Sequence, residues 1–70
     1  MKELVECHSG YQYCERPIAI WWQNERLTVV QIIEEMRSPN GKNFRVNTQK
    51  GFLFDLTYEE STDQWTITPL

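Results

Sequence analysis

Apolar and polar side chains alternate in short runs along the second half of the chain. In FLFDLTYEE (52–60), the even-numbered positions up to 58 are apolar or aromatic and the positions between them are polar, apart from a leucine at 53. KNFRVNT (42–48) alternates in the same way and places Phe44, Val46 and Thr48 on one face. Because successive side chains of a strand point to opposite faces, both runs predict strands with one buried face.

Turn-forming residues separate these runs. In SPNGK (38–42), Pro39 fixes φ and Asn40-Gly41 tolerates positive φ, while Gly51 of QKG is a candidate for a left-handed position. A final run, WTITPL (65–70), has its tryptophan and isoleucine in phase. Short strands at this spacing predict an all-β fold, an antiparallel meander of about five strands curled into a small barrel or sandwich.

PIAIWWQ (17–23) predicts a further strand and contains two adjacent tryptophans. Its Ile18, Ile20 and Trp22 are in phase, and we expect them in the core. Trp21 must then point to the opposite face of the strand.

LTVVQIIEEM (27–36) supports two alternatives. Apolar residues at positions 29, 32, 33 and 36 match the spacing of a helix, and Thr28 with Gln31 can form a capping box. Four β-branched residues at positions 29, 30, 32 and 33 favour a strand instead, and a bulge near Val30-Gln31 would account for the same pattern. The helical alternative gives an α+β fold with one short helix near 29–36.

Length and composition indicate a single folded domain. The 70 residues are 40% hydrophobic and 13% aromatic, which excludes a disordered chain. We expect a β-barrel domain over residues 17–70 and an N-terminal arm or short strands over residues 1–16. No apolar run has the length of a signal peptide or a membrane span, so we expect a cytoplasmic protein with Cys7 and Cys14 reduced.

The sequence contains no recognisable set of catalytic or metal-binding residues. Cys7, His8 and Cys14 are three possible zinc ligands, whereas a structural zinc site needs four at other spacings. There is neither a Gly-rich phosphate loop nor a nucleophile elbow. We therefore expect no enzyme activity, no metal and no cofactor.

Charge is distributed unevenly along a chain whose net charge is −3. No acidic residue lies between Met36 and Phe54, so a hairpin over residues 37–50 would present a basic edge. Basic side chains next to an aromatic ring suit phosphate contact and base stacking, which makes a nucleic-acid accessory module one alternative. Its candidate residues are Arg37, Lys42, Phe44, Arg45 and Lys50.

The preferred alternative is a non-enzymatic module that binds a protein or peptide partner. An exposed tryptophan next to tyrosine and arginine is typical of a binding hot spot, whereas a covered Trp21 would be a structural clamp. The candidate surface consists of Tyr11, Tyr13, Trp21 and Arg26. A third alternative is a structural subunit that oligomerises through an edge strand, and the oligomeric state stays open.

The series RPIAIWWQNERLTVVQIIEEMR, FRV, GFLFDL and QWTI, spread over residues 16–68, resembles a family of short uncharacterised bacterial domains. The resemblance implies a small SH3-like β-barrel, and therefore a bent strand rather than a helix at 27–36. That family is loosely associated with proteins of DNA lesion bypass, which implies a setting related to nucleic acids.

Overall fold

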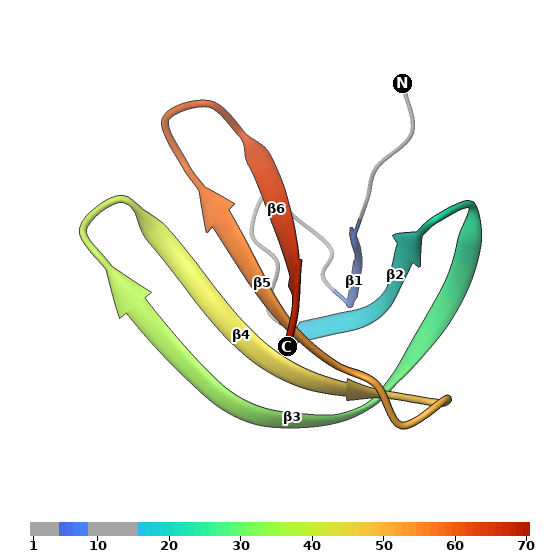
Figure 1. The fold of residues 1–70 in the computed structure, drawn as a ribbon. Helices are drawn as coiled ribbons and strands as arrows, with labels where there is room; N and C mark the ends of the chain where they lie inside the picture. The colour runs from blue at the N-terminus through green and yellow to red at the C-terminus, as the bar shows by residue number, and fades with distance from the viewer. Residues whose placement is uncertain (1–4, 9–15) are drawn as a thin grey trace.

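The computed structural model describes residues 5–8 and 16–70, and this part of the chain consists of antiparallel strands and turns (Figure 1). The strands are β1 (Val5–His8), β2 (Arg16–Trp22), β3 (Glu25–Ser38), β4 (Gly41–Thr48), β5 (Leu53–Glu59) and β6 (Gln64–Pro69). They form one six-stranded sheet in which the spatial order equals the chain order. The expected all-β meander is confirmed, with β1 as an additional strand. No helix in the described residues could cross a membrane.

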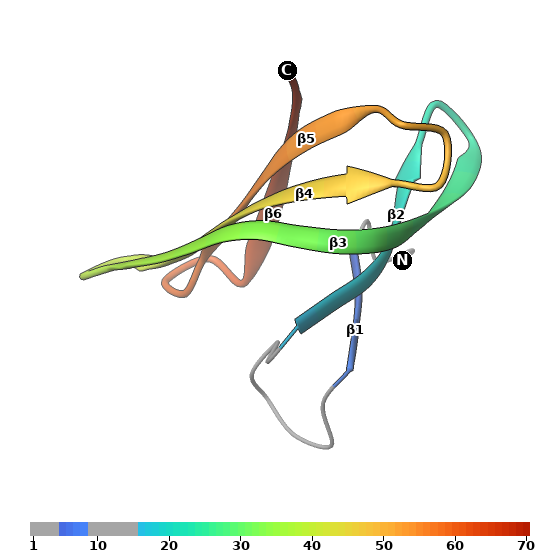
Figure 2. The same cartoon turned by 90° about the horizontal axis from the view of Figure 1, so that it is seen from below.

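The sheet curls into a half-barrel whose concave side holds the core (Figures 1 and 2). Its fully buried apolar side chains are Val5, Ile20, Leu27, Phe44, Val46, Phe54 and Leu56. Half-buried side chains packed against them are those of Cys7, Trp22, Val29, Ile32, Trp65 and Ile67. The outermost strands, β1 and β6, each pair with a single described neighbour, so the sheet curls without closing.

The disputed segment 27–36 lies within β3, a strand of 14 residues, so the helical alternative is wrong. The pairing of β3 with β4 shifts between Val29 and Gln31, where a bulge was expected, and again between Ile32 and Glu34. Each bulge inserts one residue and changes which face the following side chains occupy. Two bulges three residues apart therefore change the spacing of apolar residues along β3 from the period of two expected in a strand to one that resembles the spacing in a helix.

The turn at Asn40-Gly41 differs from the expectation. Neither residue has a positive φ. Ser38 pairs with Gly41, so Gly41 already belongs to β4 and the turn itself is formed by Pro39 and Asn40. Gly41 is required for another reason: a Cβ atom at this position would lie 1.8 Å from the backbone oxygen of Tyr58 on β5. Glycine here permits close approach of two strands rather than a left-handed turn.

Two other turns do use positive φ. Gly51 has a φ of 81°, as predicted for the connection between β4 and β5. The connection between β2 and β3 is formed by Gln23 and Asn24, with φ angles of 52° and 66°. Positive φ at both central residues of a two-residue loop defines a type I′ hairpin, whose twist matches that of the flanking strands.

Most predicted core positions are confirmed, and two are wrong. Phe44, Val46 and Thr48 of β4 are fully buried, and Trp22 packs against the core. Ile18 is 38% exposed. It has no partner residue on β1, because Pro17 and Ala19 pair with consecutive residues of that strand. It has none on β3 either, because β3 pairs with β4 from Val29 onward. Phe52 is 57% exposed, because it precedes β5 and the alternation of the strand does not reach it.

The oxidation state of Cys7 also differs from the expectation. Its side chain on β1 is disulfide-bonded rather than reduced. The other cysteine of the sequence, Cys14, lies outside the described residues.

Candidate functional site

Trp21 and Arg26 lie opposite each other on β2 and β3 and share one partner, Glu6 of β1. The Trp21 Nε1–H donates to Glu6 Oε2 over 2.9 Å. Arg26 donates from Nε to Oε2 and from Nη2 to Oε1, each over 2.9 Å. The hydrogen bond from Arg26, followed by that from Trp21, lowers the pKa of Glu6 below its usual 4.5.

This arrangement connects β1 to the β2–β3 hairpin. Two of the four residues predicted to bind a partner, Trp21 and Arg26, therefore have their polar groups engaged within the chain. The other two, Tyr11 and Tyr13, lie outside the described residues. In the described residues, Trp21 is half-buried and its indole N–H is bound by Glu6.

The basic residues of the nucleic-acid alternative do not form one surface. Phe44 is fully buried, so it has no exposed ring on which a base could stack. Arg45 pairs with Asp55 directly across the strand, Nε to Oδ1 over 3.0 Å, and Lys50 pairs with Glu25. The remaining two, Arg37 and Lys42, lie opposite each other near the β3–β4 turn.

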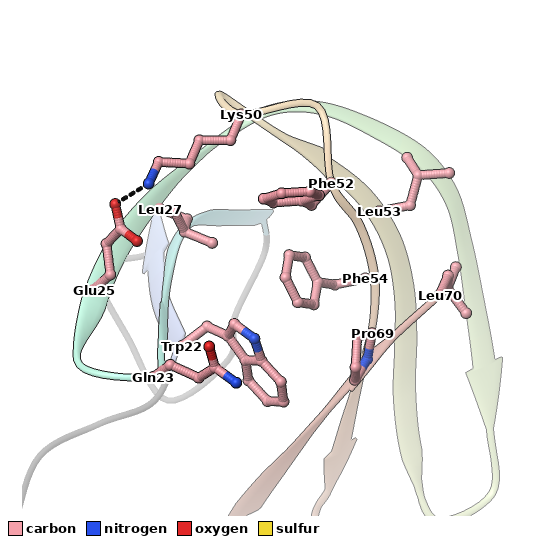
Figure 3. A pocket seen from close by; sticks show the side chains of 10 residues that line it. All are labelled: Trp22, Gln23, Glu25, Leu27, Lys50, Phe52, Leu53, Phe54, Pro69 and Leu70. Carbon is pink, nitrogen blue, oxygen red and sulfur yellow. Dashed lines mark ion pairs between the residues drawn. The ribbon is translucent and has the colours of Figure 1, made fainter.

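A pocket of about 300 Å³ opens at one end of the concave side (Figure 3). Side chains from the two hairpins β2–β3 and β4–β5 and from the end of the chain line it: Trp22, Gln23, Glu25, Leu27, Lys50, Phe52, Leu53, Phe54, Pro69 and Leu70. In Figure 3, the side chains of Trp22, Leu27, Phe52 and Phe54 face a common space. This pocket, rather than the Trp21 face, is the candidate binding site.

The pocket is held in shape by packing and by one ion pair. The rings of Trp22 and Phe54 meet edge to face, with centroids 5.6 Å apart and planes at 62°. At the rim, the ammonium of Lys50 contacts the carboxylate of Glu25, which joins the β4–β5 turn to the start of β3. The result is an apolar interior with a polar rim, the usual composition of a site that takes an apolar side chain or a small ligand.

Sequence reasoning missed this pocket, although one signal was present. Phe52, Leu53 and Phe54 are consecutive apolar residues, and a strand with one buried face cannot bury three in a row. At least one of them had to face outward or lie beyond the strand. The structure shows that Phe52 and Leu53 are exposed and Phe54 is buried.

A second hollow of about 410 Å³ lies where β2 and β3 separate. Its lining residues are Arg16, Pro17, Ile18, Val29, Val30, Gln31 and Ile32. It lacks aromatic side chains, so it offers less rigid contact area than the first pocket. In the described residues, no three or more His, Cys, Asp or Glu side chains gather closely enough to hold a metal ion.

Comparison of the chain with protein-family models, with curated proteins and with solved structures found no match.

Proposed function

We propose that this protein is a non-enzymatic binding module that holds an apolar side chain of an extended protein or peptide partner in the concave pocket. One observation supports this most strongly: Phe52 keeps 57% of its surface exposed while bordering a hollow that also contains Trp22 and Phe54. Large apolar side chains exposed around a concavity mark interaction sites. About 300 Å³ is at the lower limit of ligand pockets, which suits one large side chain better than a cofactor.

A nuclear magnetic resonance titration tests the proposal with N-acetyl-tryptophanamide and N-acetyl-leucinamide as probes and N-acetyl-glycinamide as the control ligand. We expect the two apolar probes to shift the Trp22 indole signal and the amide signals of Phe52 and Leu70, and the control to leave them in place. The Phe52→Ala variant should weaken binding of the tryptophan probe about tenfold, as truncation of an interface anchor does.

Val30→Ala is the matched control, because Val30 is 58% exposed on β3 and lines the second hollow rather than the pocket. It should bind the probes as the native chain does. Shifts scattered over the surface, or equal losses in the Phe52 and Val30 variants, would contradict the assignment of the pocket.

The nucleic-acid alternative has less support, because Phe44 is buried and both Arg45 and Lys50 are paired with acidic residues. It makes a distinct prediction in the same experiment. Short single- and double-stranded DNA would shift the signals of residues 37–50, and the shifts would decline steeply with salt.

Cys7 bears on where the module operates. The sequence predicts the cytoplasm, whereas a disulfide at Cys7 favours an oxidising compartment. Alkylation of free thiols in intact cells before lysis separates the two. A protected Cys7 would exclude the reducing cytoplasm as its location, and an alkylated Cys7 would support it.

A further inference from the structure

The strand β6 ends the sheet with an unpaired outer edge among the described strands. The backbone N–H of Leu70 donates to the carbonyl of Leu53, so the even-numbered residues of β6 direct their backbone groups toward β5. Because this direction alternates along an antiparallel strand, the odd-numbered residues Trp65, Ile67 and Pro69 direct theirs outward. The free edge therefore offers the N–H groups of Trp65 and Ile67 and three carbonyls.

This edge lacks charged residues. No charged residue occurs from Gln64 to Leu70. By contrast, the part of β3 beyond Thr28, where its pairing with β2 ends, carries Glu34, Glu35 and two bulges. Inward charges, bulges and edge lysines are the devices that prevent a strand from pairing with another chain. The proline at 69 removes one outward donor and leaves the centre of the strand free to pair.

The side chains of β6 are arranged symmetrically about Ile67. Trp65 and Ile67 pack on the core side, and Pro69 lines the concave pocket, whereas Thr66 and Thr68 are exposed on the other face. In an antiparallel pair centred on Ile67, Trp65 of one copy lies opposite Pro69 of the other, and Ile67 lies opposite itself. Apolar residues thus meet apolar residues on one face, and threonine meets threonine on the other.

We propose that two copies of this chain associate through β6 about a two-fold axis at Ile67. Each copy then donates two backbone hydrogen bonds, from Ile67 N–H to the Ile67 carbonyl and from Trp65 N–H to the Pro69 carbonyl of the second copy. A two-fold axis perpendicular to the sheet preserves its faces, so the concave surfaces of both copies become continuous. Half-buried Trp65 and Ile67 gain cover from the second copy.

Self-complementarity identifies the second copy as the occupant of this edge. An unrelated peptide would have to supply the same alternation, whereas β6 supplies it to itself at every position from 65 to 69. The acidic residue nearest the strand, Asp63, falls outside the paired stretch and accepts a hydrogen bond from Tyr58 within its own chain. The interface uses the edge of the sheet and shares only Pro69 with the lining of the pocket, so it does not rest on the proposed capture of an apolar side chain.

Analytical ultracentrifugation over a concentration series tests the proposal. The native chain should sediment with a mass that rises from 8.4 kDa toward twice that value as concentration increases. In this register Thr66 lies opposite Thr68 of the second copy, so T66K/T68K places like charges together twice. We expect about tenfold weaker association for that variant.

T66E/T68K is the matched variant. In the same register it places the glutamate of one copy opposite the lysine of the other. Like T66K/T68K, it has a lysine at position 68, which lies beside Asp55 of its own chain. It should associate at least as tightly as the native chain. E35K, on exposed β3, changes net charge as much as T66K/T68K and should associate normally. Near-ultraviolet circular dichroism verifies that all variants fold.

Single-chain mass at every concentration would overturn the proposal, and so would equal weakening in T66K/T68K and T66E/T68K. Neither result depends on the pocket. F52A should lose probe binding and retain association, whereas T66K/T68K should lose association and retain probe binding, so the two proposals fail separately.

Discussion

Phe44 and Phe52 form a natural pair for testing the assignment of core and pocket. Phe44 is fully buried, and its ring lies 6.2 Å from that of Trp65 between centroids. Truncation of a buried phenylalanine to alanine costs about 3–5 kcal/mol. At about 0.05–0.15 kcal/mol per residue, a domain of this size has a free energy of unfolding of about 3.5–10 kcal/mol. Phe44→Ala should therefore remove most of the stability.

Phe52 should behave differently, because 57% of its surface is already exposed. Its burial contributes less than half of the about 1.5–3 kcal/mol assigned to a fully buried side chain, so Phe52→Ala should cost about 1 kcal/mol. If Phe44→Ala fails to fold, Phe44→Leu keeps the comparison measurable, since it conserves most of the volume and should cost less than about 1.5 kcal/mol.

Urea unfolding followed by tryptophan fluorescence measures these differences as shifts of the midpoint at unchanged slope. The expected order of destabilisation puts Phe44→Ala well above the other two. If Phe52→Ala destabilises as strongly as Phe44→Ala, Phe52 belongs to the core and the pocket is wrongly assigned. A loss below about 1 kcal/mol for Phe44→Ala would refute the packing argument itself.

The remaining predictions concern single groups. Because hydrogen bonds from Arg26 and Trp21 lower the pKa of Glu6 below its usual 4.5, its contribution to stability is complete above that pH and is lost as pH falls through the folded value. Urea midpoints measured over this range should depend less on pH in Glu6→Gln. Gly41→Ala should destabilise strongly, because the clashing atom is a backbone oxygen, and Gly51→Ala should cost about 1–2 kcal/mol from its positive φ alone, as the space around it is open. The hydrogen bond to Asp63 and burial raise the pKa of Tyr58 to about 12. In an ultraviolet titration, one tyrosine should titrate late, and Asp63→Asn should return it toward 10.

Local pattern predicted the strands and their curled antiparallel meander, but not every feature that shapes the individual strands. The alternation around Phe44 and the turn at Gly51 are properties of a few neighbouring residues, so the sequence alone was sufficient for them. Of the two bulges of β3, the one near Val30-Gln31 was predicted and the one between Ile32 and Glu34 was not. The role of Gly41 was not predictable, since it depends on the approach of β5.

The partners of the predicted binding residues could not be read from the sequence, because they lie in distant parts of the chain. The engagement of Trp21 by Glu6 pairs residues 15 positions apart, and the sequence left open whether residues 1–16 form an arm or short strands. The pairing of Arg45 with Asp55 follows from the register of β4 with β5, which the turn between them fixes. Whether a sheet of this length closes depends on its accumulated curvature, and no single residue encodes that.

The edge position and short length of β1 set an order in which the sheet opens. β1 has four residues and one described strand neighbour, contributes Val5 to the core, and binds Trp21 and Arg26 of the β2–β3 hairpin through Glu6. β4 lies between two partners, and its Phe44, Val46 and Thr48 are fully buried. Native-state hydrogen exchange should therefore proceed from β1 inward, with the amides of β1 and the facing edge of β2 exchanging by local opening and those of β4 only when the whole sheet unfolds.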